Sequence, residues 1–319
     1  MRSEGARLET EATRRPAAGI ELDGVSRWYG NVVAVNDVTM TVAPGVTGLL
    51  GPNGAGKTTV LHLVAGLLDA SQGSVRVAGE PSWRNPGVYR GLGLVTERES
   101  APGFMSGWDF VHTSAKLHRL RNPAGAARAA LDIVELAGAQ DRRISTYSKG
   151  MRQRARVAAA LVHDPGVLLL DEPFNGMDPR QRLHMMDLLH RMSDEGRTIL
   201  FSSHILEEVE QLSGTVQVIV AGRLAASGDY RHIRRLMTSR PHVFTVRSSD
   251  DRRLAAGLMK LTSVSGVDLE DGAIQVRAND YGEFTRALPG MARDQDIRIT
   301  GLLPTDESLE RVFSYLVAT

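Results

Sequence analysis

The stretch Gly51-Pro-Asn-Gly-Ala-Gly-Lys-Thr58 decides the fold of this chain. It fits the pattern G-x-x-x-x-G-K-[ST], follows the short apolar run 46–50, and precedes a helical pattern over residues 58–68. Glycines let backbone N–H groups surround phosphate oxygens, and the amino end of the next helix adds a favourable dipole. A chance glycine turn would lack this strand and helix. The pattern therefore predicts an ATP site made of Gly51, Pro52, Asn53, Gly54, Ala55, Gly56, Lys57, Thr58 and Thr59.

Two carboxylates end a second apolar run, Val167-Leu-Leu-Leu-Asp-Glu-Pro173. Such a run is typical of a parallel strand buried on both faces. In P-loop enzymes the first acid at a strand end, here Asp171, holds Mg²⁺, usually through water. Glu172 stands where it can polarise the water that attacks the γ-phosphate, while Lys57 is expected to reach the phosphates and Thr58 to ligate Mg²⁺. An ordinary strand end is the alternative, but the P-loop upstream makes the pair more specific.

The segment Tyr147-Ser-Lys-Gly-Met-Arg-Gln153 lies between these motifs and begins a helix. Ser148 and Gly150 offer a hydroxyl, backbone N–H groups and a helix amino terminus, which together make an anion site. A plain N-cap would also explain Ser148. We interpret the nearby arginines as a solvated helical face; the alternative is that they hold a second copy's nucleotide or a partner loop. These arginines are Arg142, Arg143, Arg152, Arg154 and Arg156.

Together the motifs resemble the nucleotide-binding subunit of ABC transporters over residues 20–229. The resemblance implies that Ser148, Lys149, Gly150 and Met151 belong to the signature motif, which contacts the nucleotide of the other copy in a dimer. Of the usual L-S-G-G-Q, only Ser148 and the second glycine, Gly150, are kept. The variant Y-S-K-G-M-R-Q-R is similar to drug and antibiotic exporters of the daunorubicin-resistance type, whose membrane subunits are separate chains.

Three further roles are implied by the same resemblance. Tyr29, in Trp-Tyr-Gly, matches the aromatic residue that stacks on adenine, although a surface tyrosine at a strand end is the alternative. Asp178, in Asn-Gly-Met-Asp, matches the loop that links the two active sites. His204 matches the switch histidine at the γ-phosphate, unless it only caps the next helix. The implied catalytic residues are Glu172, His204 and Lys57.

One position departs from the family pattern. Glu97 stands where family members usually have a glutamine, at the start of the loop that joins the core to the helical subdomain. The implied metal ligands are Thr58, Asp171 and Glu97. A carboxylate can still ligate Mg²⁺, but with a full charge. If the register is off by one residue, Glu97 is a surface acid.

Composition excludes several classes of protein. The 319 residues are 42% hydrophobic and 24% charged, with a formal net charge of +1, so the chain can bury a core and carries no general signal for nucleic acid or acidic lipid. The lack of cysteine excludes disulfides and thiolate metal sites and fits a reducing compartment. No stretch offers the ~20 mostly apolar residues of a spanning helix. Residues 1–19 have no apolar h-region, so we expect a disordered tail and no signal peptide.

The predicted fold class is α/β. It is a P-loop ABC ATPase cassette over residues 20–230, with a RecA-like core, a β subdomain near the amino end and a helical subdomain at about 98–161. A linker over 231–241 leads to an α+β accessory domain over 242–319. The predicted order there is the split βαβ pattern of a ferredoxin-like domain, with a last helix at 307–316. Its late Leu-Glu-x-Val-Phe resembles the small domain appended to many such exporter ATPases.

The resemblance implies an ATP-hydrolysing subunit that uses ATP and Mg²⁺, forms a homodimer of cassettes and drives a separate transmembrane permease. The loop after Glu97, through about Val111, would dock on the permease. The protein would be cytoplasmic, peripheral at the inner face of the cell membrane, with no nucleic-acid partner. A non-transport ABC ATPase is one alternative, although the chain has one cassette and no heptad run. A regulatory subunit that binds ATP as an assembly switch is the other, favoured by the altered signature and Glu97.

Overall fold

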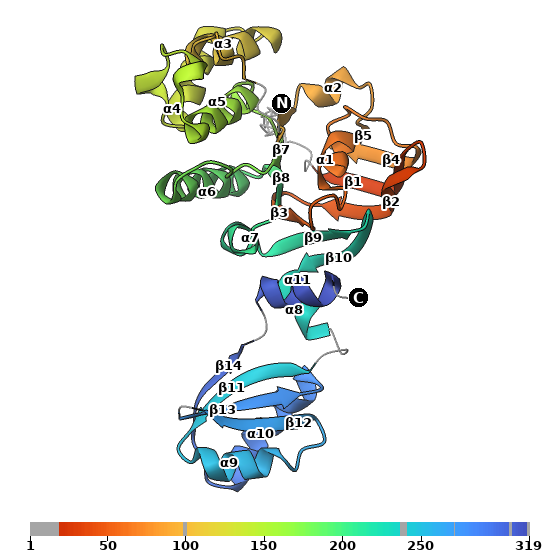
Figure 1. Cartoon of the computed structure of the whole chain (residues 1–319), viewed down its shortest axis with the longest axis vertical. Helices are drawn as coiled ribbons and strands as arrows, with labels where there is room; N and C mark the ends of the chain where they lie inside the picture. Colours follow the sequence, from red (N-terminus) through yellow and green to blue (C-terminus); the bar gives the residue numbers. More distant parts are fainter. Residues whose placement is uncertain (1–18, 98–100, 237–240, 271, 306–307, 318–319) are drawn as a thin grey trace, which may run out of the picture. The chain divides into compact units, whose positions relative to one another are not determined.

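A computed structural model describes residues 19–97, 101–236, 241–270, 272–305 and 308–317 (Figure 1). Apart from Gly19, the tail predicted at residues 1–19 lies outside the described residues. The chain forms two compact units. One contains residues 19–47, 56–202 and 221–223, and the other contains residues 48–55, 203–220 and the described part of 224–319. The cassette and accessory-domain boundaries given above stay predictions.

An antiparallel sheet lies at the amino end of the cassette. Its order is β2 (Val32–Val42), β1 (Ile20–Tyr29), β4 (Gln72–Val77) and β5 (Glu80–Pro81). Ile20, Leu22 and Val25 of β1 are buried, while the residues at its far end are exposed. Gly30 turns β1 into β2 with a φ of 56°, a conformation that glycine adopts without strain.

A second sheet has six strands. Its order is β10 (Arg223–Asp229), β9 (Thr215–Val220), β3 (Gly45–Leu50), β8 (Thr198–Ser203), β7 (Val167–Asp171) and β6 (Leu92–Val95). Strands β6, β7 and β8 are parallel, and every residue of β7 and β8 is buried, as their apolar sequences predict. Parallel strands end at the same sheet edge, which brings together the residues that follow β6, β7 and β8.

Helices connect these strands. They are α1 (Lys57–Val64), α2 (Pro86–Tyr89), α6 (Pro179–Asp194) and α7 (Leu206–Leu212). The α1 helix ends before residue 68, because Gly66 takes a φ of 67°. The α6 helix was not predicted from the sequence.

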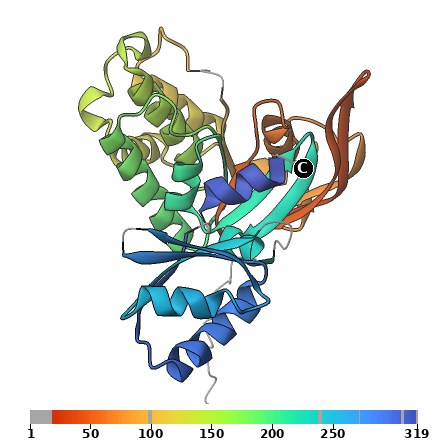
Figure 2. The same ribbon diagram turned by 60° about the horizontal axis from the view of Figure 1, so that its bottom comes forward.

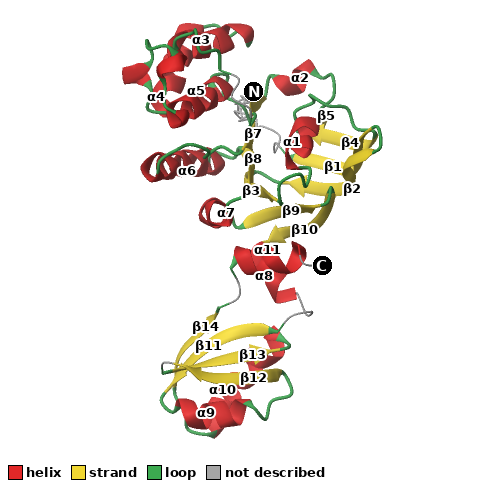
Figure 3. Cartoon of the chain, in the orientation of Figure 1, coloured by secondary structure: helices red, strands yellow, loops and turns green. Residues whose placement is uncertain are grey.

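The segment between β6 and β7 is the helical subdomain (Figure 3). It contains α3 (Gly107–Leu117), α4 (Pro123–Ile133), α5 (Lys149–Leu161) and two short 3₁₀ turns, Ala137–Ala139 and Ile144–Thr146. Side-chain oxygens of Ser106, Asn122 and Ser148 cap the three α-helices and accept backbone N–H groups that would otherwise lack partners.

The carboxy-terminal residues form a third sheet. Its elements are β11 (His242–Ser248), α9 (Asp251–Leu258), β12 (Val264–Glu270), β13 (Ala273–Ala278), α10 (Tyr281–Asp294) and β14 (Ile299–Pro304), with strand order β12-β13-β11-β14. All neighbouring strands are antiparallel. Both helices lie on one face of this sheet (Figure 2). Phe244, Ile274 and Phe284 form part of the core between them.

Two more helices belong with α7. The segment predicted as a linker begins with α8 (Tyr230–Leu236), and the last helix is α11 (Leu309–Val317), which packs against α7 and α8. Arg234 of α8 is fully buried, with its guanidinium 5.1 Å from the ring centroid of Tyr315. The Leu309 N–H donates to the Glu210 carboxylate of α7. Of the described helices, none is long and apolar enough to cross a membrane.

Candidate active site

The predicted phosphate-binding turn joins β3 to α1. Gly54 and Gly56 take positive φ angles of 79° and 108°, and the Ala55 N–H donates to the Pro52 carbonyl over 3.1 Å. A Cβ at Gly51 would lie 2.3 Å from the carbonyl oxygen of Ile219. This turn therefore requires glycine for its conformation and for its close backbone approach.

Lys57 and Thr58 open α1, and the helix has no acidic residue in its first turn. A Cβ at the N-cap residue Gly56 would lie 2.5 Å from the Ala34 carbonyl oxygen of β2. The amino end of a helix favours negative charge. Backbone N–H groups, a lysine and a hydroxyl at this end match the needs of a bound triphosphate.

Asp171 is held by hydroxyl groups on two sides. The Thr58 hydroxyl donates to its Oδ2 over 2.8 Å, although the two residues are 113 positions apart in the chain. The Ser202 hydroxyl donates to its Oδ1 over 2.5 Å and accepts the N–H of Glu172 over 3.0 Å. Ser202 thus orients both members of the acid pair.

Sequence reasoning missed Ser202. The parallel register of β7 and β8 places it directly opposite Asp171. The only sequence signal was a hydroxyl residue at the end of the apolar run 198–202, and its role can be inferred only when the strand register is known.

Glu172 has an unusual backbone. Its φ is 51°, in the left-handed region that non-glycine residues rarely adopt, and only 8% of its surface is exposed. Such a conformation costs roughly 1–3 kcal/mol and persists where the surroundings hold it in place. Here the Ser202 hydroxyl accepts its N–H, and its carbonyl accepts the Asn175 N–H over 3.3 Å.

Glu97 lies just beyond β6. Val95 pairs with Leu170 in the parallel register, so Glu97 leaves the sheet at the same edge as Asp171 and Glu172. Its side chain is exposed. This position is compatible with the predicted metal role, which stays a prediction.

The oxygen donors fit Mg²⁺ carried by a triphosphate. Within the described residues, no group of three or more His, Cys, Asp or Glu side chains could hold a metal ion. Mg²⁺ prefers oxygen ligands and is usually held by one or two carboxylates together with substrate phosphates. Thr58 and Asp171, already in contact, supply a hydroxyl and a carboxylate of this kind.

The signature segment begins α5. The Ser148 hydroxyl accepts the Met151 N–H over 3.2 Å, so Ser148 is the N-cap and its side chain is exposed. Tyr147 is buried and donates its hydroxyl to the Ala139 carbonyl over 2.8 Å. Burial raises the pKa of Tyr147, so the phenol is neutral at physiological pH.

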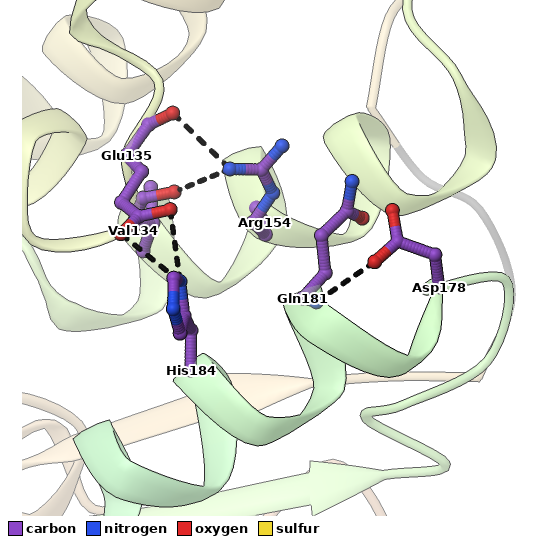
Figure 4. Close-up of polar contacts among 6 residues, drawn as sticks. All are labelled: Val134, Glu135, Arg154, Asp178, Gln181 and His184. Atoms are coloured by element: carbon purple, nitrogen blue, oxygen red, sulfur yellow. Dashed lines mark hydrogen bonds and ion pairs between the residues drawn. The ribbon is translucent and has the colours of Figure 1, made fainter.

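The signature segment packs on the predicted dimer loop. A Cβ at Gly150 would lie 2.3 Å from the Gln181 Oε1 and 3.1 Å from the Gly176 carbonyl oxygen. Asp178 accepts the Gln181 N–H over 2.9 Å and caps α6 (Figure 4). Two segments that the resemblance assigns to one dimer interface therefore lie together in the monomer.

Arg154 of α5 reaches the end of α4. It donates to the Val134 and Glu135 carbonyls over 3.0 and 3.1 Å, and the Glu135 carboxylate lies 3.1 Å from the His184 Nδ1 on α6 (Figure 4). Arg156 is buried and donates to the Gln153 Oε1 over 2.6 Å. Arg156 also donates to the Thr96 hydroxyl beyond β6 over 3.4 Å. The interpretation of the arginine cluster as a solvated face was wrong for Arg154 and Arg156, since both contact other elements.

Tyr29 and His204 are exposed, as contacts with a ligand require. Tyr29 ends β1 and is 46% exposed. His204 directly follows β8. Next to it, Ser203 accepts the Ile205 N–H over 3.0 Å and donates to the buried Glu208 carboxylate over 2.7 Å, which fixes the turn. Their nucleotide contacts stay predictions.

Comparisons with known proteins agree with this geometry. Residues 35–175 match the family model described as ABC transporter. The chain is 32% identical to the bacitracin transport ATP-binding protein BcrA of Enterococcus faecalis, over 93% of this chain and 96% of that protein. It is also 32% identical to the daunorubicin/doxorubicin resistance ATP-binding protein DrrA of Streptomyces peucetius, over 94% and 92%. The dimeric bacterial ABC transporter cassette MJ0796 has the same fold, with a TM-score of 0.61 and 20% identity over 66% of this chain and 98% of that one.

Proposed function

The chain belongs to the ATP-binding subunits of ABC transporters, and we propose that it powers export of a drug- or antibiotic-like compound through a separate transmembrane permease. The family and the cassette fold predicted from the sequence are confirmed. The names of BcrA and DrrA, for bacitracin transport and daunorubicin/doxorubicin resistance, support the class of cargo. Both relatives align with this chain over nearly its whole length, which includes the carboxy-terminal sheet.

The hydrogen bonds of Thr58 and Ser202 to the acid pair support the proposal that the chain hydrolyses ATP. A water oxygen bonds to the γ-phosphorus as the bond to the bridging oxygen breaks, and Glu172 accepts the proton of the water. Ser202 and the end of β7 hold Glu172 for this role. Lys57 and His204 contact the phosphate oxygens, where charge grows in the transition state. Mg²⁺, when bound with ATP, neutralises phosphate charge and would be held by Thr58, Asp171 and Glu97.

A homodimer would complete the site. In this arrangement each ATP lies between one P-loop and the signature residues Ser148, Lys149, Gly150 and Met151 of the other copy. Support comes from the exposed Ser148, from the packing of Gly150 on the Asp178 loop, and from the dimeric relative of the same fold. We expect Ser148→Arg to abolish ATP-driven dimerisation, measured by light scattering, and to leave ATP binding by the monomer intact. Loss of monomer binding would contradict a role for Ser148 across the dimer.

The permease would dock on the helical subdomain. A groove of about 420 Å³ lies between β6, α3 and α5, with Tyr89, Phe110 and Leu94 among its lining residues. In the loop after Glu97, Phe104 is 81% exposed and offers an apolar side chain to a partner. Docking here would hold the protein at the inner, cytoplasmic face of the cell membrane, with no nucleic acid involved.

Co-purification tests the proposal as a whole. The tagged full-length protein should bring down one membrane subunit, and the pair in proteoliposomes should move a drug-like substrate only when ATP is supplied. Phe104→Asp should reduce the recovery of the membrane subunit and spare ATP hydrolysis by the free protein. Recovery of ribosomes or DNA in place of a membrane subunit would contradict the proposal.

A further inference from the structure

Arg27 and Tyr29 lie near the end of β1, in the hairpin that contacts the start of α1. The register of β1 against β2 shifts between Arg27 and Trp28, so regular strand alternation does not place the two side chains, and their proximity is shown by their direct contact. In the β1–β2 hairpin, Arg27 pairs with Val35 and Tyr29 with Val32. A Cβ at Gly56, the N-cap of α1, would touch the same hairpin at the Ala34 carbonyl. The two side chains therefore belong to the part of the hairpin next to the phosphate-binding turn.

The guanidinium of Arg27 is held against the Tyr29 ring. Its Cζ lies 4.7 Å from the ring centroid. Its Nη1 also donates to the Asp69 carbonyl over 3.1 Å, in the segment between α1 and β4. A cation over an aromatic face is attracted by the ring quadrupole, and the planar guanidinium can stack there as an ammonium cannot. Anchored at Asp69, the guanidinium limits the movement of an otherwise exposed tyrosine.

Because the Arg27 guanidinium lies over one face of the Tyr29 ring, only the other face can stack on a base. Tyr29 ends its strand and is 46% exposed, so part of its ring is open to a ligand. We infer that Arg27 is a positioning residue of the nucleotide site, which holds Tyr29 so that its open face receives adenine. The inference rests on the proposed role of Tyr29. We therefore expect Arg27 to affect the binding of the adenine base and to have no effect on the binding of the phosphates.

The test compares two ligands on the full-length protein. Calorimetry without Mg²⁺ measures the affinity for ATP and for inorganic tripolyphosphate, which lacks the base. Arg27→Met, which keeps the chain length, should weaken ATP binding about two- to fivefold and leave tripolyphosphate binding unchanged. Arg27→Lys should recover little of the loss. Arg76→Met is the control, since Arg76 lies on β4 of the same sheet and donates to the Gly79 carbonyl, and its guanidinium stacks on no aromatic ring of the described residues.

A double-mutant cycle distinguishes the positioning role of Arg27 from the adenine contact of Tyr29. In a Tyr29→Ala background, Arg27→Met should have no further effect on ATP binding. Equal losses for ATP and tripolyphosphate, or an unchanged ATP affinity, would overturn the role of Arg27. Tighter ATP binding by Arg27→Met would also overturn it, because the guanidinium would then occupy the place of the base. If Tyr29→Ala itself spares ATP binding, the proposed adenine contact fails and the inference fails with it.

Discussion

Tyr147 and Gly107 lie so close together that a Cβ at Gly107 would be 2.2 Å from the tyrosine hydroxyl. The resemblance implies that Tyr147 stands at the usual leucine position of the signature motif, and its hydroxyl donates to the Ala139 carbonyl. Around this contact, backbone hydrogen bonds join residues 103–108 to 140–145, including Trp108 N–H to the Gln140 carbonyl over 2.8 Å. The proposed docking loop is therefore tied to the segment that precedes Ser148.

This packing predicts that Gly107→Ala destabilises the helical subdomain by about 1–3 kcal/mol, as overpacking in a filled core does. Tyr147→Phe removes the hydroxyl that the new methyl group would meet. We expect Tyr147→Phe alone to cost about 1 kcal/mol for its lost hydrogen bond, and to relieve part of the damage in the double variant. Urea unfolding of the four forms measures the coupling, and strictly additive effects would contradict the contact.

Ser202 is expected to matter for hydrolysis more than for nucleotide binding. Ser202→Ala leaves the Asp171 Oδ1 and the Glu172 N–H without their hydroxyl partner, so we expect turnover to fall about tenfold or more, since one tenfold step corresponds to 1.36 kcal/mol in the barrier. ATP affinity should change little. Thr198→Val is the control, because Thr198 is buried on the same strand and its hydroxyl has no hydrogen-bond partner among the described residues. Equal turnover of Ser202→Ala and Thr198→Val would contradict this role.

We expect Glu97 to influence how the ATPase rate depends on the Mg²⁺ concentration. A carboxylate tightens metal binding but repels the γ-phosphate oxygens when Mg²⁺ is scarce. Glu97→Gln should therefore keep measurable ATPase activity and shift the Mg²⁺ concentration for half-maximal rate, whereas Glu97→Ala should lose more activity. An Mg²⁺ titration of the three forms at fixed ATP is the measurement. Identical curves would mean that Glu97 is a bystander.

His163 predicts a loss of stability at acidic pH. Its ring stacks on His118 with 3.6 Å between centroids, and burial, followed by the charge of His118, lowers the pKa of His163 to about 4. Between pH 4 and about 6.5 the unfolded chain binds a proton at His163 that the folded chain does not bind, so the free energy of unfolding falls as pH is lowered through this window.

The expected loss at His163 is about 1–2 kcal/mol, because the ring is partly exposed and solvent screens its charge. Titration of the ring by NMR measures the pKa directly, and unfolding of His163→Gln between pH 5 and 7 isolates its share from that of the carboxylates. An ordinary histidine pKa, or the same pH dependence in the variant, would refute the prediction.

Local patterns were sufficient to predict the elements that carry most of the site. The P-loop, the apolar strand before Asp171 and Glu172, and the N-cap at Ser148 each depend on a few neighbouring residues. The strand and helix order of the carboxy-terminal residues also followed from period and turn signals. These features are properties of short segments, so one sequence is sufficient to find them.

Contacts between segments distant in the chain could not be predicted from the sequence. Ser202 bonds Asp171 because β7 and β8 are in one parallel register, and no local pattern encodes that register. Arg156 follows the polar period of α5, yet it is buried with Gln153 against neighbouring elements. Tyr147 in place of leucine looked like a weakened signature, and its fit to Gly107 and Ala139 became visible only when the subdomain was folded.

Steady-state turnover of Glu172→Gln tests whether this chain hydrolyses ATP with Glu172 as the base. With ATP affinity measured alongside, we expect normal binding, a loss of turnover of about 10²-fold or more, and accumulation of a nucleotide-locked dimer. Glu195→Gln, an exposed acid on the same unit, should hydrolyse ATP like the wild type. Turnover of Glu172→Gln near that of the wild type would mean that Glu172 is not the base and would assign that role to another residue.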